Sequence, residues 1–388
     1  MARIIRPLIA LALGSAAVVL VATGTLPATD AGALAGRVVP VLLFVVGITV
    51  VAELAAEAGV FDLVSHAFAR VARGRVPLLW ALVVVLAVLS TAFLSLDTTA
   101  VLVTPVVVVL ARQVGIPPIP FAMATVWLAN TASLLLPVSN LTNLLAAGLL
   151  DRDAPGFLAL AWAPALVGVV LPVLVLSVRY RRILAGSFTP LPREHSRDRV
   201  LLVAASVVVA ALVPLLVSGV PVEYPALAAA VVLIALFVVR RRSALAWSMA
   251  PWFPVLVAGG LFVVVATMHA RGLADAVTAW AGGGTSAGDL VRLAATGAVA
   301  ANGIDNLPAY LVLEPAAAGD PTRLVALLIG VNLGPLVTPW ASLAALLWHE
   351  RLASLGVGVR WRSYSLAGLG LVVVLVPLAA LALAITAD

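Results

Sequence analysis

The 388-residue sequence contains no cysteine and no lysine, and only 10% of its residues are charged. The absence of cysteine excludes disulfides, thiolate metal sites and a cysteine nucleophile. All of the positive charge comes from 23 arginines, which give a net charge of +6. These arginines gather at the ends of apolar segments rather than on one face. This distribution is typical of orientation signals in a membrane protein and argues against a nucleic-acid partner.

Long polar stretches are also missing. The longest, residues 179–199, is too short for a soluble domain with its own core. Hydrophobic residues make up 63% of the chain, and apolar runs long enough to cross a lipid bilayer recur from end to end, which predicts an all-α polytopic membrane protein. Full spans are expected at about 5–22, 37–55, 157–178, 200–218, 222–239, 251–269 and 364–386.

Two stretches in the two halves of the chain are imperfect copies of each other. The first is NTASLLLPVSNLTNLL, which begins at Asn130, and the second is NLGPLVTPWASLAALL, which begins at Asn332. In this alignment Pro137 coincides with Pro339. Proline removes a backbone donor and disfavours helix at the residue before it, so both apolar segments are expected to break there. Paired breaks of this kind point to the binding site of a transporter.

Each broken segment is preceded by an apolar segment that carries a carboxylate in its middle. The first contains Ser-Leu-Asp-Thr-Thr around Asp97, and the second contains Ile-Asp-Asn-Leu-Pro around Asp305. Because a helix facing lipid would not place a carboxylate there, we predict that both segments are re-entrant helical hairpins. The expected boundaries are 78–111 and 289–314 for the hairpins, and 119–150 and 322–349 for the broken helices.

The arginines indicate an orientation for these segments. If the N-terminus lies in the cytoplasm, 18 of the 23 arginines fall on the inner side, among them Arg193 and Arg197. The outer side keeps Arg37, Arg152, Arg271, Arg292 and Arg323. The positive-inside rule therefore favours a multi-pass protein of the cell membrane with a cytoplasmic N-terminus and an external C-terminus.

The same topology makes the two halves of the chain antiparallel. Residues 1–178 form the first inverted repeat, and residues 222–388 form the second. Residues 179–221 hold an arginine-rich cytoplasmic linker and a connector helix. Each repeat contains spans, one hairpin and one broken helix, an organisation typical of secondary transporters.

Asp97 and Asp305 are the two carboxylates expected at membrane depth, one near the tip of each hairpin. Burying either one ionised in hydrocarbon would cost several kcal/mol, so each should face a water-filled site, a cation or a hydrogen-bond donor. A structural alternative is that each carboxylate caps the half-helix that follows it. Both roles can hold together.

Neutral polar side chains surround these carboxylates and the two breaks. Together with unwound backbone carbonyls, they suit a small solute that is hydroxyl-rich or weakly charged, or a dehydrated sodium ion. Such side chains also satisfy backbone groups freed by a helix break. Asn130 and Asn332 either reach the site or tie the half-helices to the hairpins. The other candidate residues are Thr98, Thr99, Ser139, Asn140, Thr142, Asn143, Asn302, Asn306, Thr338 and Ser342. No metal site or cofactor is expected.

Four passages resemble the arsenical pump membrane proteins. They are TAFLSLDTTAVLVTP (91–105), NTASLLLPVSNLTN (130–143), DNLPAYL (305–311) and NLGPLVTPWASLAALLW (332–348). This family of arsenite and antimonite efflux carriers belongs to an ion transporter superfamily that also holds sodium-coupled dicarboxylate carriers. The resemblance implies that hairpin tips and broken-helix centres form one site near the midplane, worked by alternating access.

The resemblance also implies a coupling mechanism. In the best-known pumps, arsenite leaves as the neutral trihydroxide in exchange for protons, and a separate ATPase subunit can attach; dimers are common in the superfamily. No GxxxxGK[ST] phosphate loop occurs in this chain, so energy would come from an ion gradient or from such a partner. On the family pattern, Asp97 is the candidate proton carrier, and Ser139, Asn140, Thr338 and Ser342 would contact the solute or the coupling ion. Asp305, the carboxylate of the second hairpin, is the other candidate for proton coupling.

The chain departs from the family pattern at two places. The pumps often carry an aspartate at the positions of Asn130 and Asn332, and an Asn-Asn pair at the positions of Asp305 and Asn306. The leading hypothesis is an arsenite or antimonite exporter coupled to protons. The alternatives are a sodium-coupled carrier of a small organic or inorganic anion, a cation/proton antiporter, and a channel or membrane scaffold. No arginine is predicted near the breaks, which disfavours the anion carrier.

Overall fold

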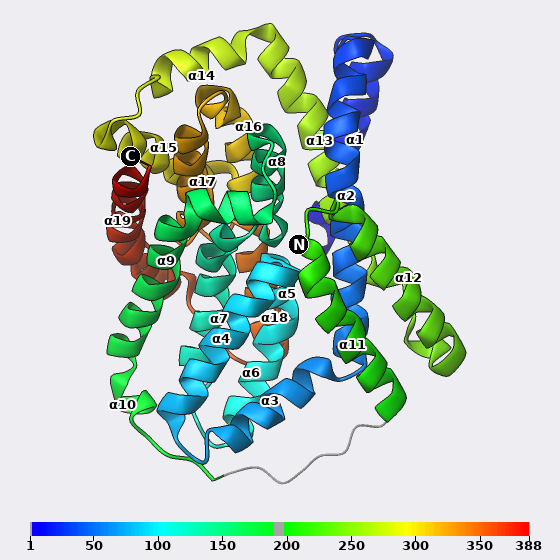
Figure 1. Cartoon of the computed structure of the whole chain (residues 1–388), viewed down its shortest axis with the longest axis vertical. Coiled ribbons are helices and arrows are strands. Elements are labelled where there is room, and N and C mark those ends of the chain that lie inside the picture. Colours follow the sequence, from blue (N-terminus) through cyan, green and yellow to red (C-terminus); the bar gives the residue numbers. More distant parts are fainter. Residues whose placement is uncertain (1, 190–197, 388) are drawn as a thin grey trace.

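The computed structural model describes residues 2–189 and 198–387, and their regular structure is helical (Figure 1). Within these residues the extended backbone is limited to one isolated bridge between Arg75 and Ser187. Eight of the described helices are long and apolar enough to cross a membrane. The expected polytopic all-α fold is therefore confirmed. Arg193 and Arg197 lie outside the described residues.

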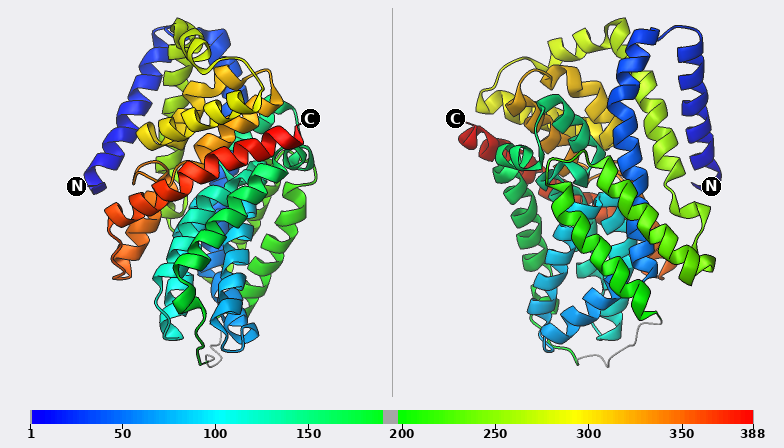
Figure 2. Two further views of the ribbon diagram at one scale, coloured as in Figure 1. Left: turned by 90° about the vertical axis from the view of Figure 1, so that its left-hand side faces the viewer. Right: turned by 45° about the vertical axis from the view of Figure 1, so that its right-hand side comes forward.

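Five helices form a group along one side of the molecule, which we term the peripheral group (Figures 1 and 2). Within it, α1 packs against α13, α13 and α12 pack against α2, and α11 packs against α12. Its members are α1 (Ala2–Ala22), α2 (Ala28–Glu57), α11 (Arg199–Leu216), α12 (Glu223–Arg240) and α13 (Trp252–Met268).

The central group is built from the hairpins, the broken helices and one closing helix of each half. In the first half, the hairpin comprises α4 (Val76–Leu94), α5 (Leu96–Thr98), a π-helical turn (Thr99–Val103) and α6 (Thr104–Gln113). The broken helix comprises α7 (Ile119–Thr131), short 3₁₀ turns at Ala132–Leu135 and Pro137–Ser139, and α8 (Leu141–Leu150). The closing helix is α9 (Ala154–Arg179).

The second half repeats this order. Its hairpin comprises α15 (Ala287–Ile304) and α16 (Asn306–Ala317), and its broken helix comprises α17 (Pro321–Leu333), an unwound segment at 334–342 and α18 (Leu343–Ser354). The closing helix is α19 (Trp361–Thr386). The first hairpin opens toward the lower end of Figure 1 and the second toward the upper end. The two halves are therefore inverted, as the sequence predicts.

Three short helices were not expected from the sequence. They are α3 (Val60–Val71), α10 (Arg181–Leu184) and α14 (Ala274–Ala281), the last joined to α13 by a kink at His269–Leu273, where Arg271 and Gly272 have non-helical backbone angles. None is long enough to cross a bilayer, because a span needs about 20 apolar residues. They contain charged residues, such as Asp62, Arg70 and Asp275, so they do not form continuous apolar runs in the sequence.

Glycines allow the second hairpin and the second broken helix to approach closely. Gly330 on α17 faces Gly297 on α15, and a Cβ atom added at Gly330 would lie 2.9 Å from the Gly297 Cα atom and 2.9 Å from the Ala298 nitrogen. Small residues are the usual contact points between membrane helices, because burial of apolar surface provides no driving force within lipid. The packing of α15 on α17 therefore depends on Gly330.

We predict that Gly330→Ala weakens this packing. The added methyl group has no room without a backbone shift, and such overpacking costs roughly 1–3 kcal/mol. The melting temperature of the purified protein in detergent should fall. Gly148→Ala on α8 is the matched control, because a Cβ atom there would meet nothing within 4 Å. Equal melting temperatures for the two variants would contradict this account.

Candidate functional site

Four helices begin inside the hairpins and broken helices, and each begins at a polar residue that caps it. The caps are Ser95 for α5, Asn140 for α8, Asp305 for α16 and Ser342 for α18. Each side chain accepts a hydrogen bond from an amide of the next turn: Thr98 at 3.3 Å, Thr142 at 3.4 Å, Leu307 at 3.1 Å and Ala345 at 3.2 Å, respectively. Such caps satisfy amides that would otherwise lack partners.

The backbone at these caps repeats between the halves. Ser95 has φ 97° and ψ 160°, and Asp305 has φ 86° and ψ 155°. Asn140 has φ −150° and ψ 145°, and Ser342 has φ −148° and ψ 147°. The positive φ of Ser95 and Asp305 costs on the order of 1–3 kcal/mol for residues other than glycine, and such strain is typical of functional sites.

This correspondence shows that Asp97 and Asp305 are not equivalent positions. Ser95 occupies the place of Asp305, whereas Asp97 lies two residues further on and corresponds to Leu307. Capping, the structural alternative considered for both carboxylates, is therefore wrong for Asp97 and holds for Asp305. The Asp97 Oδ1 atom is enclosed and has no hydrogen-bond partner among the described residues.

The hairpin of each half meets the broken helix of the other. α18 packs against α5 and the π-helical turn of the first hairpin, and α8 packs against α16 of the second hairpin. Figure 1 shows α5 and α18 side by side near the centre of the molecule. Asp97 lies on α5, and Asp305 directly precedes α16. Each carboxylate thus lies on a hairpin that contacts the broken helix of the other half.

At the first break, two side chains hold the backbone carbonyls that the break frees. The Ser139 hydroxyl donates to the Leu136 carbonyl at 2.5 Å and also to the Ser133 carbonyl. The Asn143 amide donates to the same two carbonyls, at 2.6 Å to Ser133 and 3.0 Å to Leu136. Ser139 and Asn143 are fully buried, and in this conformation their side chains donate hydrogen bonds to backbone carbonyls rather than to a solute.

Asn332 joins the two broken helices to each other. Its Oδ1 atom accepts from the Asn140 amide at 2.9 Å and from the Thr142 hydroxyl at 2.8 Å, and its Nδ2 donates to Asn143 at 2.6 Å. Asn130, its sequence counterpart, instead donates to the Val126 carbonyl at 3.0 Å. The sequence suggested that these asparagines either reach the site or connect the half-helices to the hairpins. In the structure Asn332 instead connects one broken helix to the other.

At the second break, Asn302 of the hairpin supports the unwound segment. Its Oδ1 atom accepts from the amides of Val337 at 3.1 Å and Thr338 at 3.0 Å, and its Nδ2 donates to Gly334 at 2.8 Å. The Thr338 hydroxyl donates to the Asn302 carbonyl at 2.7 Å. Asn302 and Thr338 therefore fix the second break to the tip of the second hairpin.

The remaining predicted residues lie at the hairpin tips. The Thr98 hydroxyl donates to the Leu94 carbonyl at 2.8 Å, and Thr99 accepts from the Thr91 hydroxyl at 2.9 Å. Asn306 is buried and directly follows Asp305. Among the described residues, no three His, Asp or Glu side chains are placed to hold a metal ion. Among the predicted site residues, the enclosed oxygens Oδ1 of Asp97 and Oδ1 of Asn130 have no hydrogen-bond partner within the described residues.

One ion pair beside this region was not predicted from the sequence. Arg37 on α2 donates to both carboxylate oxygens of Glu314 on α16, at 2.7 and 2.6 Å. The two residues are 277 positions apart, so no local spacing could have revealed the contact. A sequence search could only have noted that each lies within an apolar segment.

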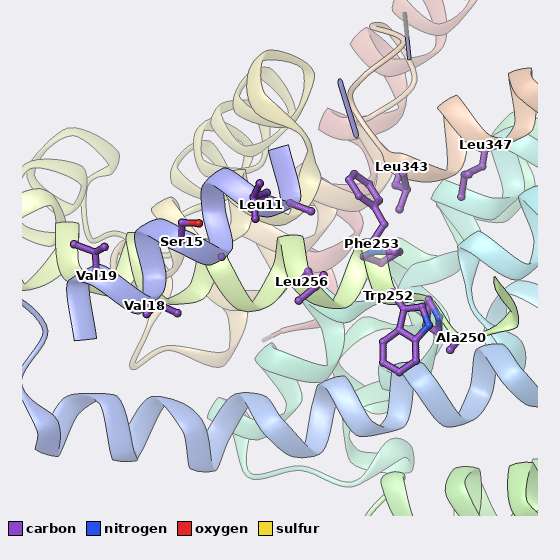
Figure 3. A pocket seen from close by; sticks show the side chains of 14 residues that line it. Leu11, Ser15, Val18, Val19, Ala250, Trp252, Phe253, Leu256, Leu343 and Leu347 are labelled. Atoms are coloured by element: carbon purple, nitrogen blue, oxygen red, sulfur yellow. The ribbon is translucent and has the colours of Figure 1, made fainter. Parts of the chain in front are cut away.

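A cavity of about 1010 Å³ lies between α1, the start of α13 and α18 (Figure 3). Leu11 and Val18 line it from α1, Trp252 from α13, and Leu343 and Leu347 from α18. It contains none of the predicted site residues. Because its lining is almost entirely apolar, this cavity suits lipid acyl chains better than a hydroxylated solute.

The known proteins to which this chain is similar are transporters and membrane pumps. The model of the CitMHS family, described as citrate transporter, matches residues 1–342. The arsenical pump membrane protein of Escherichia coli strain K12 is 27% identical over 368 residues, which cover 87% of this chain and 85% of that protein. A putative arsenical pump membrane protein of Bacillus subtilis is 22% identical over 383 residues, covering 88% and 86%.

A solved structure shows the same fold. The YdaH transporter of Alcanivorax borkumensis superposes with a TM-score of 0.58 at 15% sequence identity, and the match covers 98% of this chain and 97% of that chain. At this identity the likeness concerns the fold alone. The curated relatives, in contrast, confirm the resemblance to arsenical pumps inferred from the four passages.

We predict that Asn332→Leu destabilises the protein more than Asn130→Leu does. The first substitution leaves buried polar groups of Asn140, Thr142 and Asn143 without partners, and each unsatisfied group costs about 1–3 kcal/mol. Asn130→Leu removes a single hydrogen bond to a helix carbonyl. Thermal unfolding of both variants in the same detergent measures the difference. A larger loss for Asn130→Leu would show that Asn332 does not join the broken helices.

Proposed function

This chain belongs to the citrate transporter family CitMHS, and we propose that it exports arsenite or antimonite in exchange for protons. Its relatives establish it as a multi-pass membrane transporter of a small solute. Relatives of comparable length carry the name arsenical pump membrane protein, which supports this solute class. In the proposed cycle, the inverted halves expose one central site alternately to the two sides of the membrane.

The observation that carries the proposal is the environment of Asp97 and Asp305. Two carboxyl groups placed at hairpin tips among apolar helices cannot both remain ionised without a large cost, unless each gains a proton, a cation or hydrogen-bond donors. A neutral trihydroxide offers hydroxyl donors, and the enclosed Asp97 oxygen is an acceptor without a partner. A neutral solute and a coupling proton therefore both fit the region, and no other cofactor is needed.

A second candidate function rests on the helix starts. The N-termini of α8, α16 and α18 carry partial positive charge, which favours anions. A sodium-coupled carrier of a small anion would use these ends, and the citrate transporter description of the family favours this class. The two carboxylates oppose it, because an anion would be repelled by Asp97 and Asp305 unless sodium ions compensated their charge.

We predict that Asp97→Asn abolishes proton-coupled transport while the protein still folds. Asn keeps the size of the side chain but cannot exchange a proton, and Asp97 neither caps a helix nor pairs with a described residue through its Oδ1 atom. Arsenite uptake into everted vesicles under an imposed pH gradient measures the loss, and the melting temperature checks the fold. Normal uphill uptake by this variant would refute the coupling role.

The solute is identified with the same vesicles and the unmodified protein. We expect arsenite or antimonite to accumulate and the accumulation to collapse when a protonophore is added. Succinate, citrate and phosphate, each with and without sodium, form the comparison panel. Sodium-dependent uptake of a carboxylate without arsenite accumulation would replace the proposed function with the second candidate.

A further inference from the structure

Arg37 of the peripheral group contacts two helices of the central group at once. Its guanidinium donates to both carboxylate oxygens of Glu314 on α16, at 2.7 and 2.6 Å, and to the Leu145 carbonyl on α8 at 3.4 Å. The Arg37 side chain is 32% exposed and the Glu314 side chain 14%. This bidentate geometry is the strongest form of such a pair.

The two helices that Arg37 joins are those that begin at the candidate site. α8 starts after Asn140, and α16 starts after Asp305. Leu145 and Glu314 lie five and nine residues further along these helices, roughly one and a half and two and a half turns. Arg37 therefore fixes the far portions of both half-helices relative to α2, and with them the positions of their caps.

The pair connects elements that otherwise belong to different groups. α2 packs mainly with α12 and α13 and also contacts α8, whereas α8 and α16 belong to the central group. A second polar contact also joins the peripheral group to α16. A ring nitrogen of His269, which directly follows α13, lies 3.3 Å from the Val312 carbonyl on α16. Tyr310 on α16 lies beside both charges of the pair. These two polar contacts add to the packing of α16 against α13.

A partly buried ion pair within membrane helices is a poor device for stability alone. Removing two charges from water costs several kcal/mol, and apolar residues of similar size often serve stability equally well. An ion pair differs from apolar packing in that it has one preferred geometry and separates into two charges that water can solvate. This property suits a contact that forms in one conformation and opens in another.

We propose that Arg37 and Glu314 form a clasp that closes α8 and α16 against α2 in this conformation and opens once in each transport cycle. The clasp lies toward the side of the site where topology predicts the cell exterior. It acts as a positioning contact rather than a solute ligand. The inference requires alternating access, which is part of the proposed function, but it does not require that the solute is arsenite.

Cross-linking tests whether the clasp must open. Because the chain has no cysteine, the variant Arg37→Cys/Glu314→Cys carries only the two introduced thiols. Joining them with a short bifunctional methanethiosulfonate should lower arsenite uptake into everted vesicles on the order of tenfold, since opening steps limit turnover, and dithiothreitol should restore it. Uptake by the linked protein at the rate of the reduced protein would overturn the proposal.

A matched control uses an ion pair that lies within one group. Arg240 pairs with Asp198 at 3.1 Å between the end of α12 and the start of α11. The same reagent on Arg240→Cys/Asp198→Cys should leave uptake unchanged. Loss of uptake in this control as well would mean that linking impairs the protein generally, and the clasp proposal would lose its support.

A second measurement needs no solute and so separates the clasp from the arsenite hypothesis. Leu141→Cys at the start of α8 reports whether the site is open, through its labelling by a membrane-impermeant maleimide in right-side-out and everted vesicles. Adding Arg37→Glu places two negative charges together and should raise labelling from one side several-fold. The charge-exchanged variant Arg37→Glu/Glu314→Arg should return labelling to its original rate. Identical labelling in all three proteins would overturn the clasp even if arsenite is transported.

Discussion

The structure depends on one constraint, which is that a helix interrupted within a membrane leaves backbone groups without partners. Four interruptions occur in the central group, and side chains satisfy the freed groups at each. Ser95, Asn140, Asp305 and Ser342 cap amides, while Ser139 and Asn143 hold carbonyls. Residues that resemble solute ligands therefore serve the backbone first, and only some keep polar atoms for a solute.

The same polar atoms couple the halves mechanically. Asn332 bonds to three residues around the first break, and Asn302 fixes the second break to its hairpin. A movement of one broken helix is thereby transmitted to the other through buried hydrogen bonds. Asp305 lies three residues after Asn302 at the tip of the same hairpin.

Local chemistry made part of this arrangement predictable from the sequence. Pro137 marks the first break because proline acts on its immediate neighbours, and the broken helix was expected at 119–150, where α7 begins and α8 ends. The equivalence of Ser95 and Asp305 was missed, because it is a property of backbone angles that different side chains share. Contacts across 189 to 277 positions, such as those of Asn332 and Glu314, leave no trace in local spacing.

The match of backbone angles at Ser95 and Asp305, combined with the mismatch of their side chains, has a consequence for direction. Two inverted halves with identical side chains would give two end states of equal free energy, related to each other by a two-fold rotation about an axis in the membrane plane. Here one hairpin carries its carboxylate at the cap and the other carries it two residues inside the helix. The two end states therefore present different electric fields to the same solute. In the proposed transport cycle, the two end states would therefore be unequally populated, so the apparent affinity for the solute would differ between the two sides of the membrane, while net flux would still require a gradient.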